Sequence, residues 1–554
     1  MIGKNLRWIA SVLVASNLIL ASPSVSFGDN WGFRDPAAAV QTTTPIKHVI
    51  VIFQENISFD HYFATYPYAT NPTGEPAFFA KAGTPRVNNL LSGGLLDQNP
   101  NSTQPFRMDT GVASVTCDQN HNYTPEQQAA DHGLMDKFPE FVGSGNSAAF
   151  PCNDYGKGSG VTMGYFDGNT VTAFWNYAQH FAMSDNSYGT MFGPSTVGAL
   201  NLIAGTTSLA TLQPSADGSK AATVKNASGN IAGPSLTGPA IGDPRPFYDD
   251  CVATDPTTSK LFTKIRISVA GTNVGDLLNA KGITWGWFQG GFAPTGVDVQ
   301  GRAICGAHHV GLAGDDAVTT SGDYIPHHEP FEYFSQSTNQ HHLRPSSPSA
   351  IGQTDRANHQ YDLSDFWTAL KLGELPSVTY LKAGAYQDGH PGYSDPIDEQ
   401  VFVVGVVNAI MASAYWNDTA IIILYDDSDG WYDHAMGPVV NQSAVADDAI
   451  AGVDGCGAAT TNTQGQCGYG PRQPLLVISP YAKVNYVDHR VTDQSSVLRF
   501  IEDNWGLGRI GGNSTDAKAG TLDGFFNFDL NPFNNAPPLF LDPSTGEIPQ
   551  LLPH

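Results

Sequence analysis

The sequence predicts an α/β protein built on a doubly wound, mostly parallel sheet that is flanked by helices. Short apolar runs rich in Val, Ile and Phe end in polar residues, which is typical of buried strands. Longer segments with helical patterning alternate with these runs, as they do in βαβ units. The predicted strands are 46–53, 283–288, 377–381, 420–425 and 474–479, and the predicted helices are 171–183, 196–204, 398–416 and 492–504.

The strand over 46–53 ends abruptly at Gln54, and Glu55 and Asn56 follow at once. Open α/β sheets place their ligands at the carboxyl ends of strands. A carboxylate and an amide side by side at such a point favour a hard metal ion, because such ions prefer oxygen ligands. A polar turn after a strand is the alternative, since short motifs occur often by chance.

The strand over 420–425 ends in the same way, in Asp426 and Asp427. Two neighbouring carboxylates at a buried strand end repel each other unless a cation or protons neutralise them. An acidic turn containing glycine is the alternative, because Asp-Gly pairs are common in turns. Since two separate strands both end in adjacent oxygen ligands, we predict that one divalent ion binds Glu55, Asn56 and this aspartate pair.

A candidate nucleophile lies between these strands, in the segment FGPSTVGALNL over 192–202. A Gly-Pro turn leads into a predicted helix, and Ser195 and Thr196 fall in its first turn. A helix start offers unpaired N–H groups and a positive dipole end, which favour a phosphate or an alkoxide. An ordinary Ser/Thr N-cap is the alternative. The chain has no G-x-S-x-G elbow, so we expect a bound metal to activate the serine.

Seven motifs occur in a single order between about residues 46 and 506. They are QENISFDHYF, DQNHNYTPEQ with Met135-Asp136-Lys137-Phe138, FGPSTVGALNL, DYIPHHEPFEYF, DGHPGYSD, YDDSDGWYDH and GPRQPLLVISPYA. Together they resemble the bacterial phosphoesterase family of secreted acid phosphatases and phospholipases C, which implies an alkaline-phosphatase-like fold. The nucleophile segment is more similar to the acid phosphatase branch, since phospholipases C tend to carry threonine at position 195. Val197 replaces the second proline that this branch leads us to expect.

The resemblance implies metal binding by Glu55, Asn56, Asp426 and Asp427, and catalytic roles for six further residues. These six are a serine nucleophile, four histidines of the phosphate pocket and one helix amide, namely Ser195, His121, His327, His328, His390 and Asn201. Surface or structural roles are the alternative for the histidines, and helix packing is the alternative for the amide. His121 and His390 are the main candidates for the general acid.

The predicted activity is hydrolysis of phosphate monoesters through a phosphoserine, with an optimum on the acid side of neutrality. The predicted cofactor is one divalent ion, and calcium, magnesium, manganese and zinc all suit the ligands. A phospholipase C that cuts phosphatidylcholine-like diesters is the closest alternative. A sulfatase would need a C/S-x-P-x-R signature, which the chain lacks. A non-enzymatic surface protein would leave the two pairs of oxygen ligands without a purpose.

The first 27 residues are expected to be a secretory signal peptide. Lys4 and Arg7 precede an apolar stretch over 9–21 that is too short to span a membrane. The mature protein is therefore expected in the periplasm or outside the cell, without stable membrane insertion. The six cysteines suit an oxidising compartment. Their spacing favours the pairs Cys117–Cys152, Cys251–Cys305 and Cys456–Cys467.

The net charge of −25 would become −27 if Lys4 and Arg7 were removed with the signal segment. Such a chain is not expected to bind nucleic acid, because a phosphate backbone attracts basic patches. Small phosphate monoesters are the expected substrates, with phospholipid head groups as a second class, and the oligomeric state is left open. Lys382 and Arg472 are candidate helpers in phosphate binding, but a solvated surface position is favoured for both.

One catalytic domain is predicted over 28–507, because the motifs are scattered along the chain and must converge on one site. A segment over about 206–262, rich in Ser, Thr, Ala and Gly, is expected to be an insertion of loops and short β structure. The tail over 508–554 is expected to wrap the domain, and Phe525, Phe526, Phe528 and Phe533 are expected to attach it.

Overall fold

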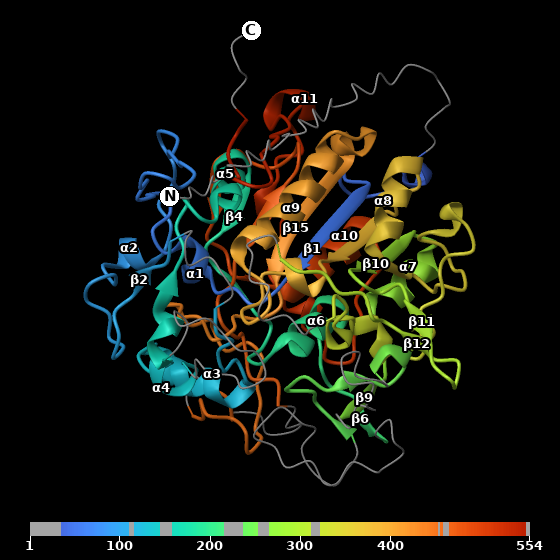
Figure 1. The fold of residues 1–554 in the computed structure, drawn as a ribbon, viewed down its shortest axis with the longest axis horizontal. Helices are drawn as coiled ribbons and strands as arrows, with labels where there is room; N and C mark the ends of the chain where they lie inside the picture. Colours follow the sequence, from blue (N-terminus) through green and yellow to red (C-terminus); the bar gives the residue numbers. More distant parts are fainter. Residues whose placement is uncertain are drawn as a thin grey trace, which may run out of the picture. The chain divides into compact units, whose positions relative to one another are not determined.

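An eight-stranded sheet forms the centre of the fold in the computed structural model (Figure 1), which describes residues 35–109, 116–143, 158–214, 237–252, 265–311, 322–452, 455–457 and 465–549. Residues from Asp35 onward form one compact unit. The strand order is β13-β10-β14-β1-β15-β16-β4-β17. The strands are β1 (His48–Gln54), β4 (Ala182–Ser184), β10 (Trp285–Gln289), β13 (Gln360–Asp362), β14 (Val378–Lys382), β15 (Thr419–Tyr425), β16 (Leu475–Ile478) and β17 (Tyr486–Asp488).

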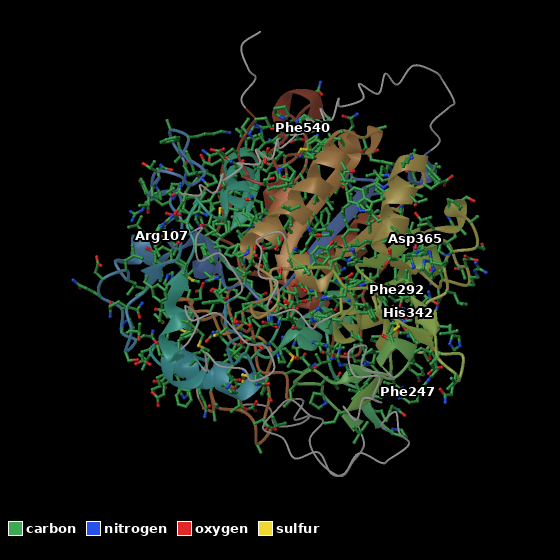
Figure 2. The ribbon with its side chains drawn as sticks, in the orientation of Figure 1. Arg107, Phe247, Phe292, His342, Asp365 and Phe540 are labelled. Atoms are coloured by element: carbon green, nitrogen blue, oxygen red, sulfur yellow. A yellow bond between two sulfur atoms is a disulfide. The ribbon has the colours of Figure 1, made fainter. Side chains whose placement is uncertain are left out.

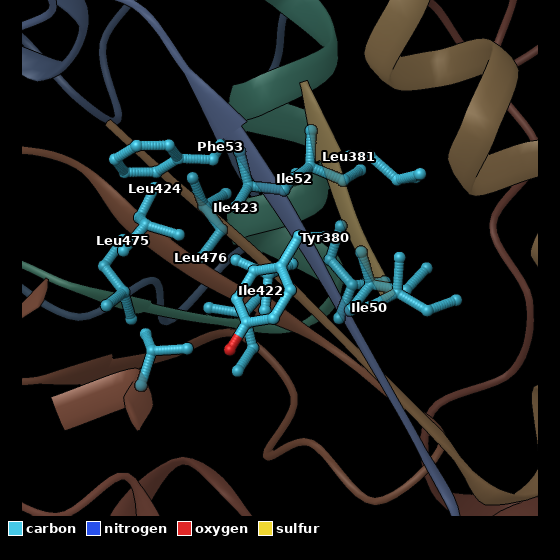
Figure 3. Packing of buried hydrophobic residues seen from close by; sticks show 14 of the residues in the cluster. Ile50, Ile52, Phe53, Tyr380, Leu381, Ile422, Ile423, Leu424, Leu475 and Leu476 are labelled. Atoms are coloured by element: carbon cyan, nitrogen blue, oxygen red, sulfur yellow. The ribbon is translucent and has the colours of Figure 1, made fainter. Parts of the chain in front are cut away.

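The centre of this sheet is parallel and fully buried, which confirms the predicted fold class. Strand β1 pairs with β14 on one side and with β15 on the other, both in parallel. Gln54 at the end of β1 lies opposite Tyr425 at the end of β15. Figure 3 shows the apolar side chains of these strands packed together, with Ile52, Leu381 and Ile423 among them. Because the strands end in register, the polar residues that follow them meet at one edge of the sheet.

The predicted strand 474–479 exists as β16, but the prediction that it is parallel was wrong. It pairs antiparallel with both neighbours, with Val477 opposite Ile422 of β15 and Ala182 of β4. The described residues between β15 and β16 form no helix. A parallel strand requires a crossover that returns the chain to the other end of the sheet. Without one, the chain enters β16 from the end where β15 stopped.

Two pairs of long helices flank the sheet, α5 (Thr172–His180) with α9 (Pro396–Met411) and α6 (Ser195–Ala204) with α10 (Gln494–Trp505). All four were predicted, although two end earlier than expected. Residues 182–184 leave the first helix to form β4, and a 3-10 turn at Ala414–Asp418 follows α9. Helix α8 (Leu363–Leu372) packs against β10 and β13, and Figure 1 shows it together with α9.

Shorter elements complete the fold. The remaining helices are α1 (Phe59–Phe63), α2 (Leu90–Gly93), α3 (Tyr123–Ala130), α4 (Phe138–Phe141), α7 (Val274–Lys281) and α11 (Pro532–Asn535). A four-stranded sheet in the order β7-β6-β9-β8 consists of β6 (Ala210–Gln213), β7 (Thr237–Gly238), β8 (Arg245–Pro246) and β9 (Arg266–Val269). The short paired strands are β2 (Phe106–Arg107), β3 (Gly164–Tyr165), β5 (Ser187–Tyr188), β11 (Gly296–Val297), β12 (Ala303–Ile304) and β18 (Thr492–Asp493).

The described part of the predicted insertion therefore contains short strands, while residues 215–236 and 253–264 lie outside the described ranges. The C-terminal tail lies against α9, because Asn408 donates a hydrogen bond to the carbonyl of Leu541. Phe525 and Phe526 are buried and Phe528 is partly buried, whereas the side chain of Phe533 lies outside the description.

Two of the predicted disulfides are present, Cys251–Cys305 and Cys456–Cys467. Cys117 is also disulfide-bonded, while its predicted partner Cys152 and the predicted signal peptide over 1–27 lie outside the described ranges. Among the residues that the structure describes, no helix is both long enough and apolar enough to cross a bilayer.

A buried histidine stabilises the region around the disulfide between Cys251 and Cys305. Figure 2 shows His342 beside Phe292, and their rings stack with centroids 4.0 Å apart. The Nε2 atom of His342 lies 2.9 Å from Asp249 Oδ1, and its Nδ1 atom lies 3.4 Å from the sulfur of Cys305. These contacts give this histidine, which belongs to none of the motifs, a structural role.

Candidate active site

Five of the predicted site residues meet where the ends of β1 and β15 face the start of α6. Glu55 follows β1, Asp427 lies two residues after β15, and Ser195 is the first residue of α6; all three are buried. The hydroxyl of Ser195 donates to Asp427 Oδ2 at 3.1 Å and lies 3.3 Å from Glu55 Oε2. The in-register ends of β1 and β15 bring Asn56 and Asp426 to the same place, where the backbone N–H of Asn56 donates to Asp426 Oδ1 at 3.1 Å.

The side-chain amide of Asn56 faces the three carboxylates. One of its two polar atoms lies 2.8 Å from Glu55 Oε2, 2.9 Å from Asp426 Oδ1 and 3.3 Å from Asp427 Oδ2. Without a cation this atom would have to be the nitrogen, because an amide oxygen cannot donate to a carboxylate. A cation among these atoms would let the amide oxygen and the carboxylates all act as ligands. The residues therefore fit a divalent ion that prefers oxygen.

The electrostatics of the acidic residues support the same interpretation. Burial, and then the charge of Glu55, raises the pKa of Asp426 to about 7. Burial also raises the pKa of Asp427 well above its ordinary value, although the charge of His121 opposes the shift. Carboxylates with such pKa values cannot all be ionised at neutral pH unless a further positive charge neutralises them.

Lys382 supplies one positive charge at this point, and the prediction that it is solvated was wrong. It is the last residue of β14 and is fully buried. Its ammonium group contacts Glu55 Oε1 and lies 3.8 Å from Asp426 Oδ2. Burial lowers the pKa of Lys382, but the neighbouring carboxylates outweigh this effect and raise it overall. The sequence showed only that Lys382 stands at the end of the strand-like segment PSVTYLKA.

Arg472 is also buried, so the surface prediction was wrong for this residue too. Its Nε atom donates to Asp433 at 3.0 Å, and its guanidinium lies 3.4 Å from Asp60 Oδ1. Further hydrogen bonds reach the carbonyls of Asn88 and Asp185. These contacts connect the loops around the sheet edge, and they make Arg472 a structural residue.

Three of the four predicted histidines lie around the cluster of oxygen ligands. His328 is buried, and its Nδ1 atom lies 2.9 Å from Glu55 Oε1. His390 has its Nε2 atom 2.9 Å from the amide of Asn56, and its Nδ1 atom faces the carbonyl of Pro391. The ring of His121 lies 5.9 Å from that of His390.

His121 and His390 differ in charge, which separates the two candidates for the general acid. Burial, and then the charge of His121, lowers the pKa of His390 well below its ordinary value. Burial also lowers the pKa of His121, but three carboxylates outweigh burial and raise it well above the ordinary value. Its Nδ1 atom lies 3.3 Å from Asp429 Oδ1 and 3.6 Å from Asp118 Oδ1. Of the two, His121 is therefore the histidine whose raised pKa favours the protonated form.

The described contacts of two predicted residues lie elsewhere. Asn201 donates to the carbonyl of Val197 within its own helix, as the helix-packing alternative predicts. His327 has its Nδ1 atom 2.9 Å from the guanidinium of Arg245. Its neighbour His328 faces the oxygen ligands instead, so adjacent residues of one motif point to different partners.

Glu126 is a site residue that the sequence analysis did not identify. This buried residue of α3 accepts hydrogen bonds from the backbone N–H of Gly193 at 2.8 Å and from the hydroxyl of Ser428 at 2.9 Å. It therefore joins the turn before Ser195 to the loop that carries Asp427. Gly193 adopts a φ of 117°, a conformation that favours glycine. The position of Glu126 in the DQNHNYTPEQ motif was the only signal.

The fold and this geometry define an α/β protein in which a cluster of oxygen atoms suited to a cation lies beside a buried serine. Residues 46–508 match the profile of the Phosphoesterase family, so the chain belongs to this family, as its motifs predicted.

The curated relatives of the chain include phospholipases C. The chain is 24% identical to the non-hemolytic phospholipase C of Pseudomonas aeruginosa over 525 residues, covering 91% of this chain and 60% of that protein. It is 24% identical to phospholipase C B of Mycobacterium tuberculosis over 92% of this chain and 82% of that protein. The chain thus spans only about 60% of the Pseudomonas relative's length.

A solved structure of a protein in the alkaline phosphatase superfamily from Vibrio parahaemolyticus is also similar to this chain. Sequence identity is 12%, and the likeness covers 76% of this chain and 78% of that one. The TM-score of this match is 0.26.

Proposed function

We propose that the chain is a metal-dependent phosphoric ester hydrolase that uses Ser195 as its nucleophile. The convergence of the Ser195 hydroxyl with Glu55 Oε2 and Asp427 Oδ2 carries this proposal. A serine needs a base or a metal to attack phosphorus. The three carboxylates and one amide around it are suited to hold one divalent ion. That ion would lower the pKa of the serine hydroxyl and neutralise the charge on the phosphate oxygens.

The residues around the serine suggest how the reaction proceeds. The hydroxyl of Ser195 loses its proton to solvent, its oxygen bonds to phosphorus, and the bond between phosphorus and the leaving alcohol breaks. His121 holds the proton for that alcohol. Its Nδ1 atom faces Gln119 and Asp429, so Nε2 is the nitrogen that can deliver the proton. Water then hydrolyses the phosphorylated Ser195 and restores the hydroxyl.

His390 and Asn56 have supporting roles in this proposal. His390 stays neutral because its pKa is lowered by burial and by the charge of His121. The contact between its Nε2 atom and the amide of Asn56 orients that amide toward the carboxylates. His328 similarly fixes Glu55 through Oε1.

The relatives favour phospholipid diesters as the substrate class, because they are named as phospholipases C. The reaction would then be phospholipase C-type hydrolysis. This was the alternative in the sequence analysis. An acid phosphatase acting on monoesters remains a second candidate, because Ser195 stands where phospholipases C of the family tend to carry threonine. The two candidates share the nucleophile and the ion, and they differ in whether the phosphate carries a second ester.

Rates with three substrates distinguish these activities in the purified mature protein: p-nitrophenyl phosphate, p-nitrophenyl phosphorylcholine and phosphatidylcholine vesicles. Phospholipase C-type activity predicts that both choline diesters are cleaved at least tenfold faster than the monoester. The reverse order would assign the acid phosphatase function.

A pair of variants at Ser195 tests the nucleophile. Ser195→Ala is expected to lower every measurable rate by roughly a thousandfold or more, because it removes the hydroxyl that attacks phosphorus. Ser195→Thr retains a hydroxyl and serves as the matched control. Retention of more than a percent of the rate by Ser195→Ala would exclude this residue as the nucleophile.

The predicted secretion is part of the same proposal. A basic segment followed by an apolar stretch opens the chain, and phospholipids or phosphate esters outside the cytoplasm would then be the substrates. Sequencing the amino terminus of the protein recovered from the periplasm or medium tests this, and a terminus that begins at Met1 would contradict it.

A further inference from the structure

The two carboxylate oxygens of Glu55 face two different environments. Oε2 faces Ser195 at 3.3 Å and the amide of Asn56 at 2.8 Å, which is the side of the proposed divalent ion. Oε1 faces the Nδ1 atom of His328 at 2.9 Å and the ammonium group of Lys382. Glu55 therefore bridges two positions where positive charge is needed.

The second of these positions has the composition of a cation site. Glu55, His328 and Asp388 have ligand atoms that all lie within 4.8 Å of one another, and all three residues are buried. Asp388 Oδ2 is buried and has no hydrogen-bond partner among the described residues. Asp426 Oδ2 approaches from the side of β15, 3.8 Å from the Lys382 nitrogen. Buried carboxylates crowded in this way require a positive charge.

Lys382 is held in this position by the sheet. It ends β14, next to β1, so that its side chain enters the site from a fixed point. Its nitrogen lies 5.0 Å from the centre of the Phe53 ring, a favourable distance for a cation over an aromatic face. The side chain is fully buried and cannot exchange its partners for water.

We propose that the ammonium group of Lys382 permanently occupies a second cation position, so that the site needs one divalent ion where two could otherwise bind. This inference rests on the proposed function, because it assumes an ion on the Oε2 side of Glu55. The tethered ammonium offsets one of the negative charges of Glu55, Asp388 and Asp426 without dissociating. It also gives the site a further positive charge without a second metal.

The number of bound ions tests this proposal without any measurement of activity. Mn²⁺ binding is measured by equilibrium dialysis at pH 8 for the wild type, Lys382→Ala and Lys382→Arg. Lys382→Ala opens space among the carboxylates and is expected to bind one more Mn²⁺ per chain than the wild type. Lys382→Arg keeps the positive charge and is expected to bind the same number as the wild type. Methylammonium should displace the additional ion from Lys382→Ala, because it restores the missing charge.

A second variant covers the case in which Lys382→Ala does not fold, which circular dichroism would reveal. Lys382→Met fills most of the volume but has no charge, so it removes the repulsion between the ammonium and the divalent ion. Its affinity for the first Mn²⁺ is expected to rise roughly tenfold. An unchanged or weaker affinity in Lys382→Met, or equal ion counts in Lys382→Ala and the wild type, would overturn the inference. A wild type that binds no Mn²⁺ would instead refute the proposed metal site itself.

Discussion

Glu126→Ala is expected to destabilise the protein and to slow catalysis, although Glu126 touches neither the serine nor the four oxygen ligands. The substitution removes the acceptor for the buried N–H of Gly193 and for the hydroxyl of Ser428. Leaving a buried donor without a partner costs about 1–3 kcal/mol, and a typical hydrogen bond of a neutral carboxyl contributes about 0.5–1.5 kcal/mol. We expect the free energy of unfolding to fall by about 2–4 kcal/mol and kcat to fall at least tenfold, because the turn before Ser195 loses its anchor.

Glu126→Gln is the matched control, because the amide oxygen can accept from Gly193 and the amide nitrogen can donate to the Ser428 oxygen. Its loss of stability at acid pH should be below about 1 kcal/mol, and its kcat should stay within a few-fold of the wild type. The difference between the two variants therefore isolates the hydrogen bonds from the volume of the side chain.

The pH dependence of stability provides an independent test of the same residue. Burial raises the pKa of Glu126 from 4.5 to about 7 in the folded state. The folded protein therefore holds this proton more tightly than the unfolded chain. The resulting stability is fully present below pH 4.5 and is lost as the pH rises through about 7. The loss is at most about 3 kcal/mol, since one pKa unit corresponds to about 1.4 kcal/mol.

Urea unfolding of the wild type and Glu126→Gln at pH 4.5, 6 and 8 measures this effect. The kcat values of Glu126→Ala and Glu126→Gln are compared at one pH. Glu126→Gln cannot titrate, so its stability relative to the wild type should rise steadily with pH. A difference that stays constant between pH 4.5 and 8 would show that burial does not raise the pKa of Glu126. Equal kcat values in Glu126→Ala and Glu126→Gln would show that this carboxylate does not hold the serine turn.

Three further predictions follow from the site. Asp426→Asn should lower both bound divalent metal, measured by elemental analysis, and turnover, and full metal content with full turnover would contradict the proposed ligand set. His121→Asn should lower kcat/KM most at pH values below the raised pKa of His121, because the wild type keeps the catalytic proton there. The decline of kcat/KM at alkaline pH should therefore disappear in this variant. An unchanged dependence of kcat/KM on pH would remove His121 as the acid. Asn201→Ala should leave turnover within about twofold and cost about 1 kcal/mol of stability, because the hydrogen bond that its side chain makes among the described residues stays within its own helix. A larger loss of turnover with unchanged stability would return Asn201 to the site.

The local pattern of the sequence was sufficient to predict the parts of the site that follow strands or begin a helix. Glu55 and Asp426 come directly after buried strands, and parallel strands that end in register bring such residues together. Ser195 begins a helix after a Gly-Pro turn, as predicted. These features depend on short segments whose burial and ends are visible in the residue types themselves.

Only the tertiary structure decided the direction of β16 and the burial of Lys382 and Arg472. A strand pattern has no direction, and the direction of β16 depends on where the preceding loop leaves the chain. A lysine or arginine is normally solvated, so its burial is determined by carboxylates that are distant in the sequence, such as Glu55 for Lys382 and Asp433 for Arg472. The sequence by itself therefore determined which residues end the strands and begin the helix, while the tertiary structure decided which distant charges neutralise them, because charge pairing depends on contacts in space.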